Sequence, residues 1–154
     1  MKREFPMKKH IFATVFFLAA ALAVSACDDS GGTAEELVQK AKEQRAEHRL
    51  RGAVIELKNA LQKDPKSVEA RGLLGVVSLE LGDVGSAQKE LERARDLGWP
   101  IGEYVRPLGR IWLLRGDANK VLDEFVVTDG MSNETKAKVL TVRAEAWLRR
   151  TQSC

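Results

Sequence analysis

The apolar residues of this chain follow two different patterns. Residues 11–24 form an apolar run that only Thr14 interrupts. From residue 34 onward, apolar residues recur at steps of three and four, which predicts amphipathic helices that each bury one face. The first pattern is shorter than the roughly 18 residues that suggest a membrane span. The second pattern predicts an all-α domain.

The helical part of the sequence repeats with a 34-residue period. Gly75 and Gly109 are 34 positions apart, and the pair Gly82-Asp83 returns as Gly116-Asp117 at the same interval. Further matches at this spacing are Ala53 with Ala87 and Val121, Ala60 with Ala94, and Leu57 with Leu91 and Phe125. A fixed period of this length is typical of repeat proteins, in which each unit packs against its neighbours.

Each unit is predicted to be a helical hairpin. In the second unit, residues 70–81 predict one helix, Gly82-Asp83 breaks it, and residues 87–94 predict another. We expect Gly75 and Ala87 where the two helices cross, because larger side chains there would hold the backbones apart. One hairpin cannot bury its own apolar faces, so neighbouring hairpins should stack into a right-handed superhelix with a concave groove.

This spacing resembles the tetratricopeptide repeat (TPR), with its Leu-Gly pair, a Gly-Asp turn, two alanines in the second helix and a terminal proline. The resemblance implies a TPR-type αα-hairpin superhelix of about three repeats plus a final helix. The first unit is the poorest match, since Ala41 stands at the glycine position and His48-Arg49 at the Gly-Asp position. Pro107 lies in the first helix of the third unit, where we expect it to kink that helix or delay its start.

Residues 133–150 predict the final helix, with Val139, Val142, Ala146 and Trp147 spaced to face the stack. Two interpretations stay open for it. It is either a helix that caps the array or the start of a further repeat in a truncated chain.

The start of the chain has the order of a secretory signal peptide. Residues 1–10 are basic, residues 11–24 are apolar, and Ser25 and Ala26 are small. We therefore predict a signal peptide over residues 1–26. The alternative is that residues 11–24 form a helix of the folded domain. A helix on the surface of a domain alternates apolar with polar residues, and residues 11–24 do not.

The sequence VSAC, residues 24–27, resembles a bacterial lipobox. The resemblance implies that Cys27 carries covalent diacylglycerol and N-acyl lipid, so residues 27–33 would be a lipidated N-terminus and tether and residues 34–154 the TPR domain. Ordinary signal cleavage at the same place is the other interpretation, and it would leave Cys27 with a free thiol. Asp28 and Asp29 resemble an inner-membrane retention signal, which implies a location on the inner membrane facing the periplasm, with the outer membrane as the alternative. The same residues also suit a solvated linker.

Charge and the side chains capable of chemistry limit the classes of function. Four of the 25 basic residues and one of the 22 acidic residues precede Cys27, so the rest of the chain has 21 of each and is neutral. Because nucleic-acid binding needs a basic surface that neutralises phosphates, this balance argues against a nucleic-acid partner. Of the two histidines, His10 belongs to the signal peptide and His48 lies among arginines near a turn. We find no phosphate loop, nucleophile elbow or metal-ligand spacing. We therefore expect a protein that is not an enzyme, with no cofactor beyond the lipid, no metal and no small-molecule substrate.

Function should then reside in the concave groove, which the first helix of each repeat lines. Aligning the units predicts nine inward-facing residues: Val38, Lys42, Arg45, Leu73, Val76, Leu79, Arg106, Arg110 and Leu113. This apolar strip flanked by cations suits a protein partner, either an extended peptide or a helix with acidic residues. The alternative is that the two arginines pair with Glu103 or other carboxylates and that the apolar residues are core between repeats. The three tryptophans are expected to serve packing.

The segment AVIELKNALQKDPKSVEARGLLGVVSLELGD, residues 53–83, together with VRPLGRIWLLRGDANKVLDEF, residues 105–125, resembles a narrower group. These are the TPR lipoproteins encoded alongside PEP-CTERM sorting and exopolysaccharide genes, and the resemblance covers residues 27–147. It implies a membrane-anchored, periplasm-facing scaffold for polysaccharide export or protein sorting, of which this chain would be the amino-terminal part. The alternatives are an assembly factor for an outer-membrane or pilus machine and a truncated remnant of a longer TPR protein.

Overall fold

The computed structural model describes residues 32–152, and the segment from Thr33 onward forms one helical unit. Its helices are α2 (Ala34–Ala46), α3 (Leu50–Lys63), α4 (Val68–Glu80), α5 (Val84–Asp96), α6 (Ile101–Leu114), α7 (Ala118–Glu124) and α8 (Asn133–Gln152). The predicted signal peptide, Cys27 and most of the tether lie outside the described residues. The predicted all-α fold is confirmed, because every regular element in residues 32–152 is a helix.

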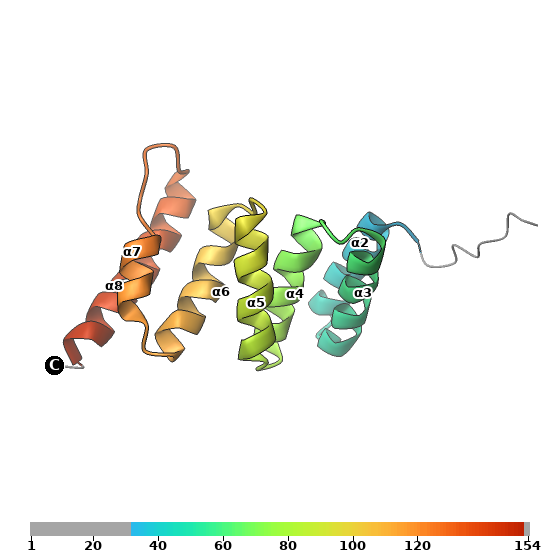
Figure 1. Ribbon diagram of the computed structural model, residues 1–154, viewed down its shortest axis with the longest axis horizontal. Coiled ribbons are helices and arrows are strands. Elements are labelled where there is room, and N and C mark those ends of the chain that lie inside the picture. Colours follow the sequence, from blue (N-terminus) through green and yellow to red (C-terminus); the bar gives the residue numbers. More distant parts are fainter. Residues whose placement is uncertain (1–31, 153–154) are drawn as a thin grey trace, which may run out of the picture. The chain divides into compact units, whose positions relative to one another are not determined.

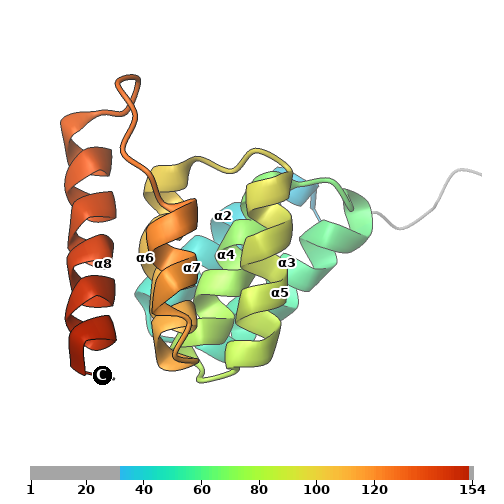
Figure 2. The same ribbon diagram turned by 60° about the vertical axis from the view of Figure 1, so that its left-hand side comes forward.

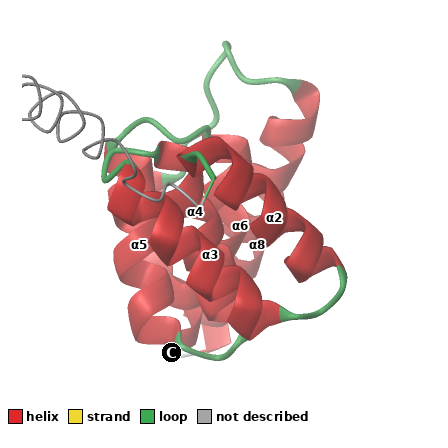
Figure 3. Ribbon diagram, turned by 90° about the vertical axis from the view of Figure 1, so that its right-hand side faces the viewer, coloured by secondary structure: helices red, strands yellow, loops and turns green. Residues whose placement is uncertain are grey.

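The helices pair into consecutive antiparallel hairpins that stack side by side (Figure 1). Helix α2 packs on α3 and α4 on α5, and each hairpin then contacts the next. The first helices of successive units also contact one another, α2 with α4, α4 with α6 and α6 with α8. Figure 3, which looks along the stack from its α2–α3 end, shows these first helices in one layer and α3 and α5 in another. This arrangement confirms the stacked αα-hairpins that the 34-residue period predicts.

Two clusters of buried side chains hold the stack together. The first lies between α2, α3 and α4 and includes Leu37, Leu57 and Leu74. The second joins α5 to α8 and is centred on the fully buried Trp112 and Phe125. Each cluster draws on more than one hairpin, so no hairpin completes its own core.

The close approach of helices at Gly75 is confirmed. A Cβ atom at Gly75 would lie 2.6 Å from Leu91 Cγ and 3.1 Å from the Ala87 carbonyl oxygen of α5. At Gly109, a Cβ would lie 2.4 Å from Val142 Cγ1 of α8 and 3.3 Å from the Phe125 ring. Both glycines therefore let a neighbouring helix approach α4 or α6 more closely than any side chain would allow.

The turns inside the hairpins share one backbone conformation. Gly82 and Gly116 have φ values of 82° and 83°, and His48, which precedes Gly82 by one repeat period, has φ 58°. Asp83 then caps α5 by accepting a hydrogen bond from the Ser86 backbone N–H at 3.0 Å. The bonds from Ser86 hold the pKa of Asp83 below its ordinary value. The prediction that His48 occupies the glycine position of the first turn is thus confirmed.

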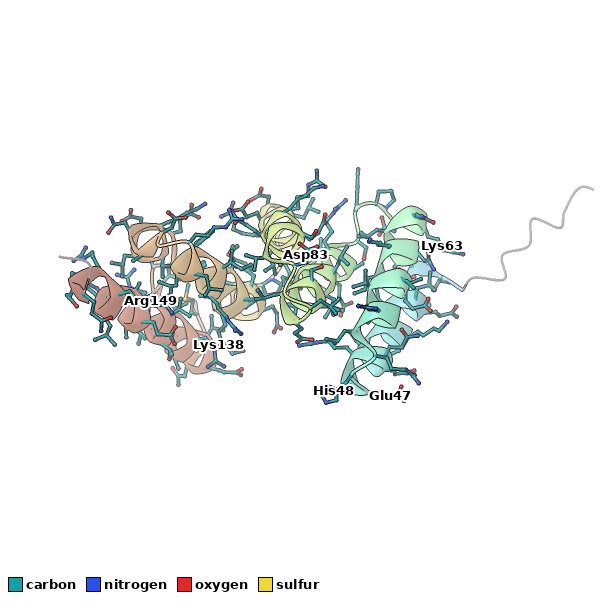
Figure 4. All side chains as sticks on the ribbon, turned by 90° about the horizontal axis from the view of Figure 1, so that it is seen from below. Glu47, His48, Lys63, Asp83, Lys138 and Arg149 are labelled. Carbon is teal, nitrogen blue, oxygen red and sulfur yellow. The ribbon has the colours of Figure 1, made fainter. Side chains whose placement is uncertain are left out.

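Replacing His48 with glycine should stabilise the protein by about 0.5–1 kcal/mol. A left-handed conformation costs an L-residue roughly 1–2 kcal/mol, and the greater freedom of glycine in the unfolded chain offsets part of the gain. The side chain of His48 is exposed in the α2–α3 turn (Figure 4), so little packing is lost. Urea denaturation followed by circular dichroism measures the change. The reverse variant Gly82→His is the control and should destabilise; equal stability of His48→Gly and the parent would contradict the account.

The third unit departs from the pattern of the first two. Helix α7 has only 7 residues, and the longer loop after it leads to α8, which packs on both α6 and α7 at the end of the stack (Figure 2). Arg143 of α8 closes the short helix: its Nη1 donates hydrogen bonds to the carbonyl oxygens of Leu122 and Phe125, the latter at 2.8 Å. An arginine from α8 thus satisfies carbonyl groups at the end of α7.

Of the two effects expected of Pro107, a kink or a delayed start of α6, the delay is not found, and the expected packing of Trp147 is wrong. Helix α6 begins at Ile101 and continues through Pro107, so the proline does not delay its start. Val139, Val142 and Ala146 are buried as predicted, but the Trp147 side chain is 49% exposed and faces away from the stack. Among the described residues, no helix is long and apolar enough to cross a membrane.

Candidate protein-binding groove

An open groove of about 530 Å³ lies on the first-helix layer. Four helices contribute to it, α2, α4, α6 and α8, together with the α5–α6 connection. Its lining residues are Arg45, Leu73, Val76, Leu79, Glu80, Trp99, Gly102, Glu103, Arg106, Pro107, Arg110, Lys138, Val142 and Glu145. The groove therefore depends on the stacking of successive repeats, because no single hairpin supplies more than part of it.

Apolar side chains of α4 form one wall of this groove. Leu73, Val76 and Leu79 are half-buried, so each presents part of its surface to the groove. Trp99, between α5 and α6, packs over Gly72, where a Cβ would lie 2.3 Å from the indole ring. The missing side chain at Gly72 thus lets the indole lie against α4 and extend the apolar wall.

Two of the groove's cations are held by carboxylates of the chain. Arg45 of α2 binds Glu80 of α4 at 2.6 Å, and the hydrogen bonds with Glu80 raise the pKa of Arg45. Lys138 of α8 binds Glu134 at 2.7 Å. These pairs orient side chains at the two ends of the groove.

Arg106 and Arg110 of α6 differ from Arg45 and Lys138 because no carboxylate of residues 32–152 binds them. Both are exposed, and within residues 32–152 neither makes an ion pair or a hydrogen bond. They are four positions apart on one helix face, a spacing at which like charges cost about 0.2–0.5 kcal/mol. The expected alternative, pairing of these arginines with Glu103, is not found in the described chain. The groove thus offers two cations on α6 that make no ion pair within residues 32–152.

The structure places six of the nine predicted groove residues in this lining: Arg45, Leu73, Val76, Leu79, Arg106 and Arg110. Val38 and Leu113 are absent from the lining and belong to the two cores. Lys42 lies outside the lining and binds Glu69 of α4 at 2.6 Å. The alignment of repeats gives the correct helices for these three residues, but it does not show that neighbouring helices cover Val38 and Leu113 or that Lys42 binds Glu69.

Sequence reasoning missed several lining residues. Trp99 lies in a connection rather than in a first helix, while Lys138, Val142 and Glu145 come from α8, which the sequence marks only as a final helix. The 34-residue period places Val142 in register with Leu74 and Leu108, and all three are buried. Helix α8 therefore takes the position of a first helix in a fourth unit.

Within residues 32–152, no three His, Cys, Asp or Glu side chains lie together in a way that could hold a metal ion. Trp112 is fully buried and stacks on Phe125 with ring centroids 5.0 Å apart, which confirms a packing role for it.

One family model matches part of the repeat array. Residues 34–97 match the tetratricopeptide repeat family. The described chain has the fold of a TPR-type array of helical hairpins. The match spans α2 to α5, the two hairpins with the most regular geometry, and the same fold continues into α6, α7 and α8. A comparison with curated proteins gives no match for this chain. TPR arrays generally mediate binding between proteins, which supports an interaction scaffold.

Proposed function

We propose that this protein is a membrane-anchored TPR scaffold that binds a segment of another protein in the groove lined by α2, α4, α6 and α8. The observation that carries this proposal is the pair Arg106 and Arg110, exposed and unpaired within residues 32–152, beside the apolar wall of α4. Carboxylates of a bound segment would relieve the repulsion between the two arginines and form charge-assisted hydrogen bonds with them.

The composition of the groove defines the segment it favours. Four basic residues (Arg45, Arg106, Arg110, Lys138) and three acidic residues (Glu80, Glu103, Glu145) line it, so its overall charge is nearly balanced. The unpaired cations, however, lie together on α6, beside the apolar side chains of α4. A peptide with two neighbouring acidic residues and an apolar anchor a few residues away would match this arrangement.

Replacing both Arg106 and Arg110 with alanine should weaken binding of such a segment at least tenfold without lowering helix content. Each lost charge-assisted hydrogen bond costs up to about 1.5–3 kcal/mol, and a tenfold loss of affinity corresponds to about 1.4 kcal/mol. Fluorescence anisotropy with a labelled acidic–apolar peptide measures the affinity. Circular dichroism and thermal unfolding report whether the fold is intact.

The control for this variant is Arg93→Ala combined with Lys89→Ala. Both residues lie on α5, four positions apart, and away from the groove lining. This control removes the same charge and should leave binding nearly unchanged at moderate salt. An equal loss in both variants would show that only net charge matters, and a fall in helicity for the Arg106 and Arg110 variant would show that these arginines are structural.

The finer part of the proposal concerns location. We propose that Cys27 carries the lipid and holds the TPR array at the inner membrane facing the periplasm, where the array serves polysaccharide export or sorting of PEP-CTERM proteins. The resemblance of VSAC to a lipobox and the resemblance of residues 27–147 to that group support this part. Lipid chains stabilise membrane attachment by about 0.8 kcal/mol per buried methylene. One chain therefore gives only marginal attachment, whereas two or three chains on the cysteine hold the protein firmly in the membrane.

Replacing Cys27 with serine should release the protein from membranes or halt its processing, since a hydroxyl does not replace the thiol that takes the lipid. Fractionation of cells into membrane and periplasmic pools measures the distribution, and mass spectrometry of the N-terminus shows acylation directly. Cys154→Ser, which removes the other cysteine, is the control. Unchanged membrane attachment of Cys27→Ser protein whose signal peptide has been cleaved would refute the lipid anchor and leave the groove proposal untouched.

A further inference from the structure

Of the three tryptophans of the chain, all within residues 32–152, Trp99 alone lines the groove. Trp112 is fully buried in the core, and Trp147 is exposed on α8 outside the lining. The Trp99 side chain is partly exposed, and its Nε1–H has no hydrogen-bond acceptor among residues 32–152. Trp99 therefore keeps ring surface and an N–H group for contacts with a bound molecule.

The backbone on both sides holds Trp99 in place. Gly98 has φ 91°, a conformation that favours glycine, and follows the end of α5. The Trp99 backbone N–H donates a hydrogen bond to the Ala94 carbonyl oxygen at 2.9 Å, and Pro100 fixes the chain at the start of α6. A side chain on a backbone held in this way loses less conformational freedom on binding, which favours affinity.

The missing side chain at Gly72 makes the seat for the indole. A Cβ there would lie 2.3–2.5 Å from three atoms of the ring, so even alanine would push the ring away from α4. The next residue of α4, Leu73, and Val76 one turn later line the groove beside this seat. We call Trp99, Leu73 and Val76 the Trp99 platform.

The repeat fold does not require an indole at this position. The residue 34 positions before Trp99 is Pro65, in the α3–α4 connection. The residue 34 positions before Gly72 is Val38, an ordinary side chain of the first core. The first two hairpins thus join without a tryptophan and a glycine at these positions. The indole–glycine pair belongs to the groove rather than to the repeat.

The charges of the groove that have no partner are mixed in sign. Four charged side chains of the lining make no ion pair within residues 32–152: Glu103, Arg106, Arg110 and Glu145. Two are acidic and two are basic, so net charge does not decide what binds at the platform. The position of each charge relative to the platform does.

Both signs of charge lie beside the platform. Glu103 is in the first turn of α6, four positions after Trp99 in the chain. Gly72, under the indole, precedes Arg106 by one 34-residue period, and α4 contacts α6, so Arg106 lies next to the platform on the neighbouring helix. A charged side chain of either sign would meet a like charge there, whereas an uncharged apolar side chain would not.

We infer that Trp99 determines the specificity of the groove by receiving a large, uncharged apolar side chain, leucine or an aromatic residue, of the bound segment. The acidic residues of that segment bind Arg106 and Arg110. This inference rests on the proposed function, because it names the anchor of the same segment. A large anchor covers ring surface that a methyl group would leave in water, and tryptophans in such positions commonly dominate binding.

Four versions of the labelled acidic–apolar peptide test this inference. They differ only at the anchor, which is alanine, leucine, phenylalanine or lysine. Anisotropy titrations with the full chain should show the leucine and phenylalanine peptides binding at least tenfold tighter than the alanine peptide, with lysine no better than alanine. Trp99→Ala should reduce this preference to less than threefold, and Gly72→Ala should do the same by displacing the ring. Trp99→Phe, which keeps a ring, should retain most of it.

Each variant has a matched control. Trp147→Ala removes the same side chain from a position that is 49% exposed and outside the groove lining. Gly85→Ala adds a Cβ whose nearest neighbour lies 3.8 Å away. Both controls should keep the full preference for large anchors, and circular dichroism should show the same helix content in all variants.

The outcomes separate this inference from the proposed function. A preference for large anchors that persists in Trp99→Ala, an equal loss in Trp147→Ala, or tightest binding of the lysine peptide would overturn the inference, while dependence on Arg106 and Arg110 would still support the groove. Uniform weakening of all four peptides with lower helicity in Trp99→Ala would show that Trp99 is only structural. If the parent protein bound none of the peptides, both proposals would fail.

Discussion

Replacing Trp112 with alanine is expected to lower the free energy of unfolding by about 3–5 kcal/mol, the range for removing a large aromatic side chain from a core. Trp112 is fully buried, stacks on Phe125 and lies beneath Lys120, whose Nζ is 4.5 Å from the ring centre. Because this cluster joins α6, α7 and α8, its loss should disorder the last unit first. Urea denaturation followed by circular dichroism measures the change.

Two further variants separate the causes of this effect. Trp147→Ala removes the same side chain from an exposed position and should cost less than about 1 kcal/mol. Trp112→Phe should cost less than Trp112→Ala, because it keeps a ring against Phe125 and removes the indole Nε1, which has no hydrogen-bond partner in the described structure. Equal effects of Trp112→Ala and Trp147→Ala would contradict the assignment of Trp112 to the core.

Replacing Gly75 with valine should destabilise the protein by about 2–3 kcal/mol, since overpacking a well-filled contact typically costs about 1–3 kcal/mol. The new Cβ would lie 2.6 Å from Leu91 Cγ and 3.0 Å from the Leu91 backbone nitrogen, and backbone atoms cannot move aside as a side-chain end can. We therefore expect the α4–α5 hairpin to open slightly and the α4 wall of the groove to shift.

Gly85→Val is the matched control for this prediction. A Cβ at Gly85 would have Asp83 Oδ1 at 3.8 Å as its nearest neighbour, so the side chain projects into open space. Thermal unfolding should show almost no change for this control and a clear loss for Gly75→Val. If both variants lost the same stability, backbone propensity rather than helix crossing would explain the cost.

Much of the fold could be predicted from the sequence, because one 34-residue period links every unit. The Gly-Asp turns, the crossing at Gly75 and even the unusual His48 turn follow from aligning the repeats. The early end of α7 could not be found this way. At this end the Phe125 carbonyl group accepts a hydrogen bond from Arg143, which lies 18 residues later in the sequence.

Only part of the groove could be predicted from the alignment of the repeats. Repeat alignment assigns a residue to a helix face, but burial also depends on what the neighbouring helix covers. Leu113 is thus enclosed by the α5–α8 core, whereas Arg110, one turn earlier, stays exposed. Trp99 joins the groove from a connection, where helical periodicity gives no information. Pro107 lines the groove, and α6 continues through it.

The central claim is that the concave groove binds a protein partner. Site-specific photo-crosslinking in native membranes tests it most directly, with the crosslinker placed at Pro107 in the groove and, as control, at Lys89 on α5. We predict a discrete crosslinked product from position 107 that disappears when Arg106 and Arg110 are replaced with alanine, and no such product from position 89. Equal products from both positions, or a product from position 107 that persists without the arginines, would contradict the proposed groove.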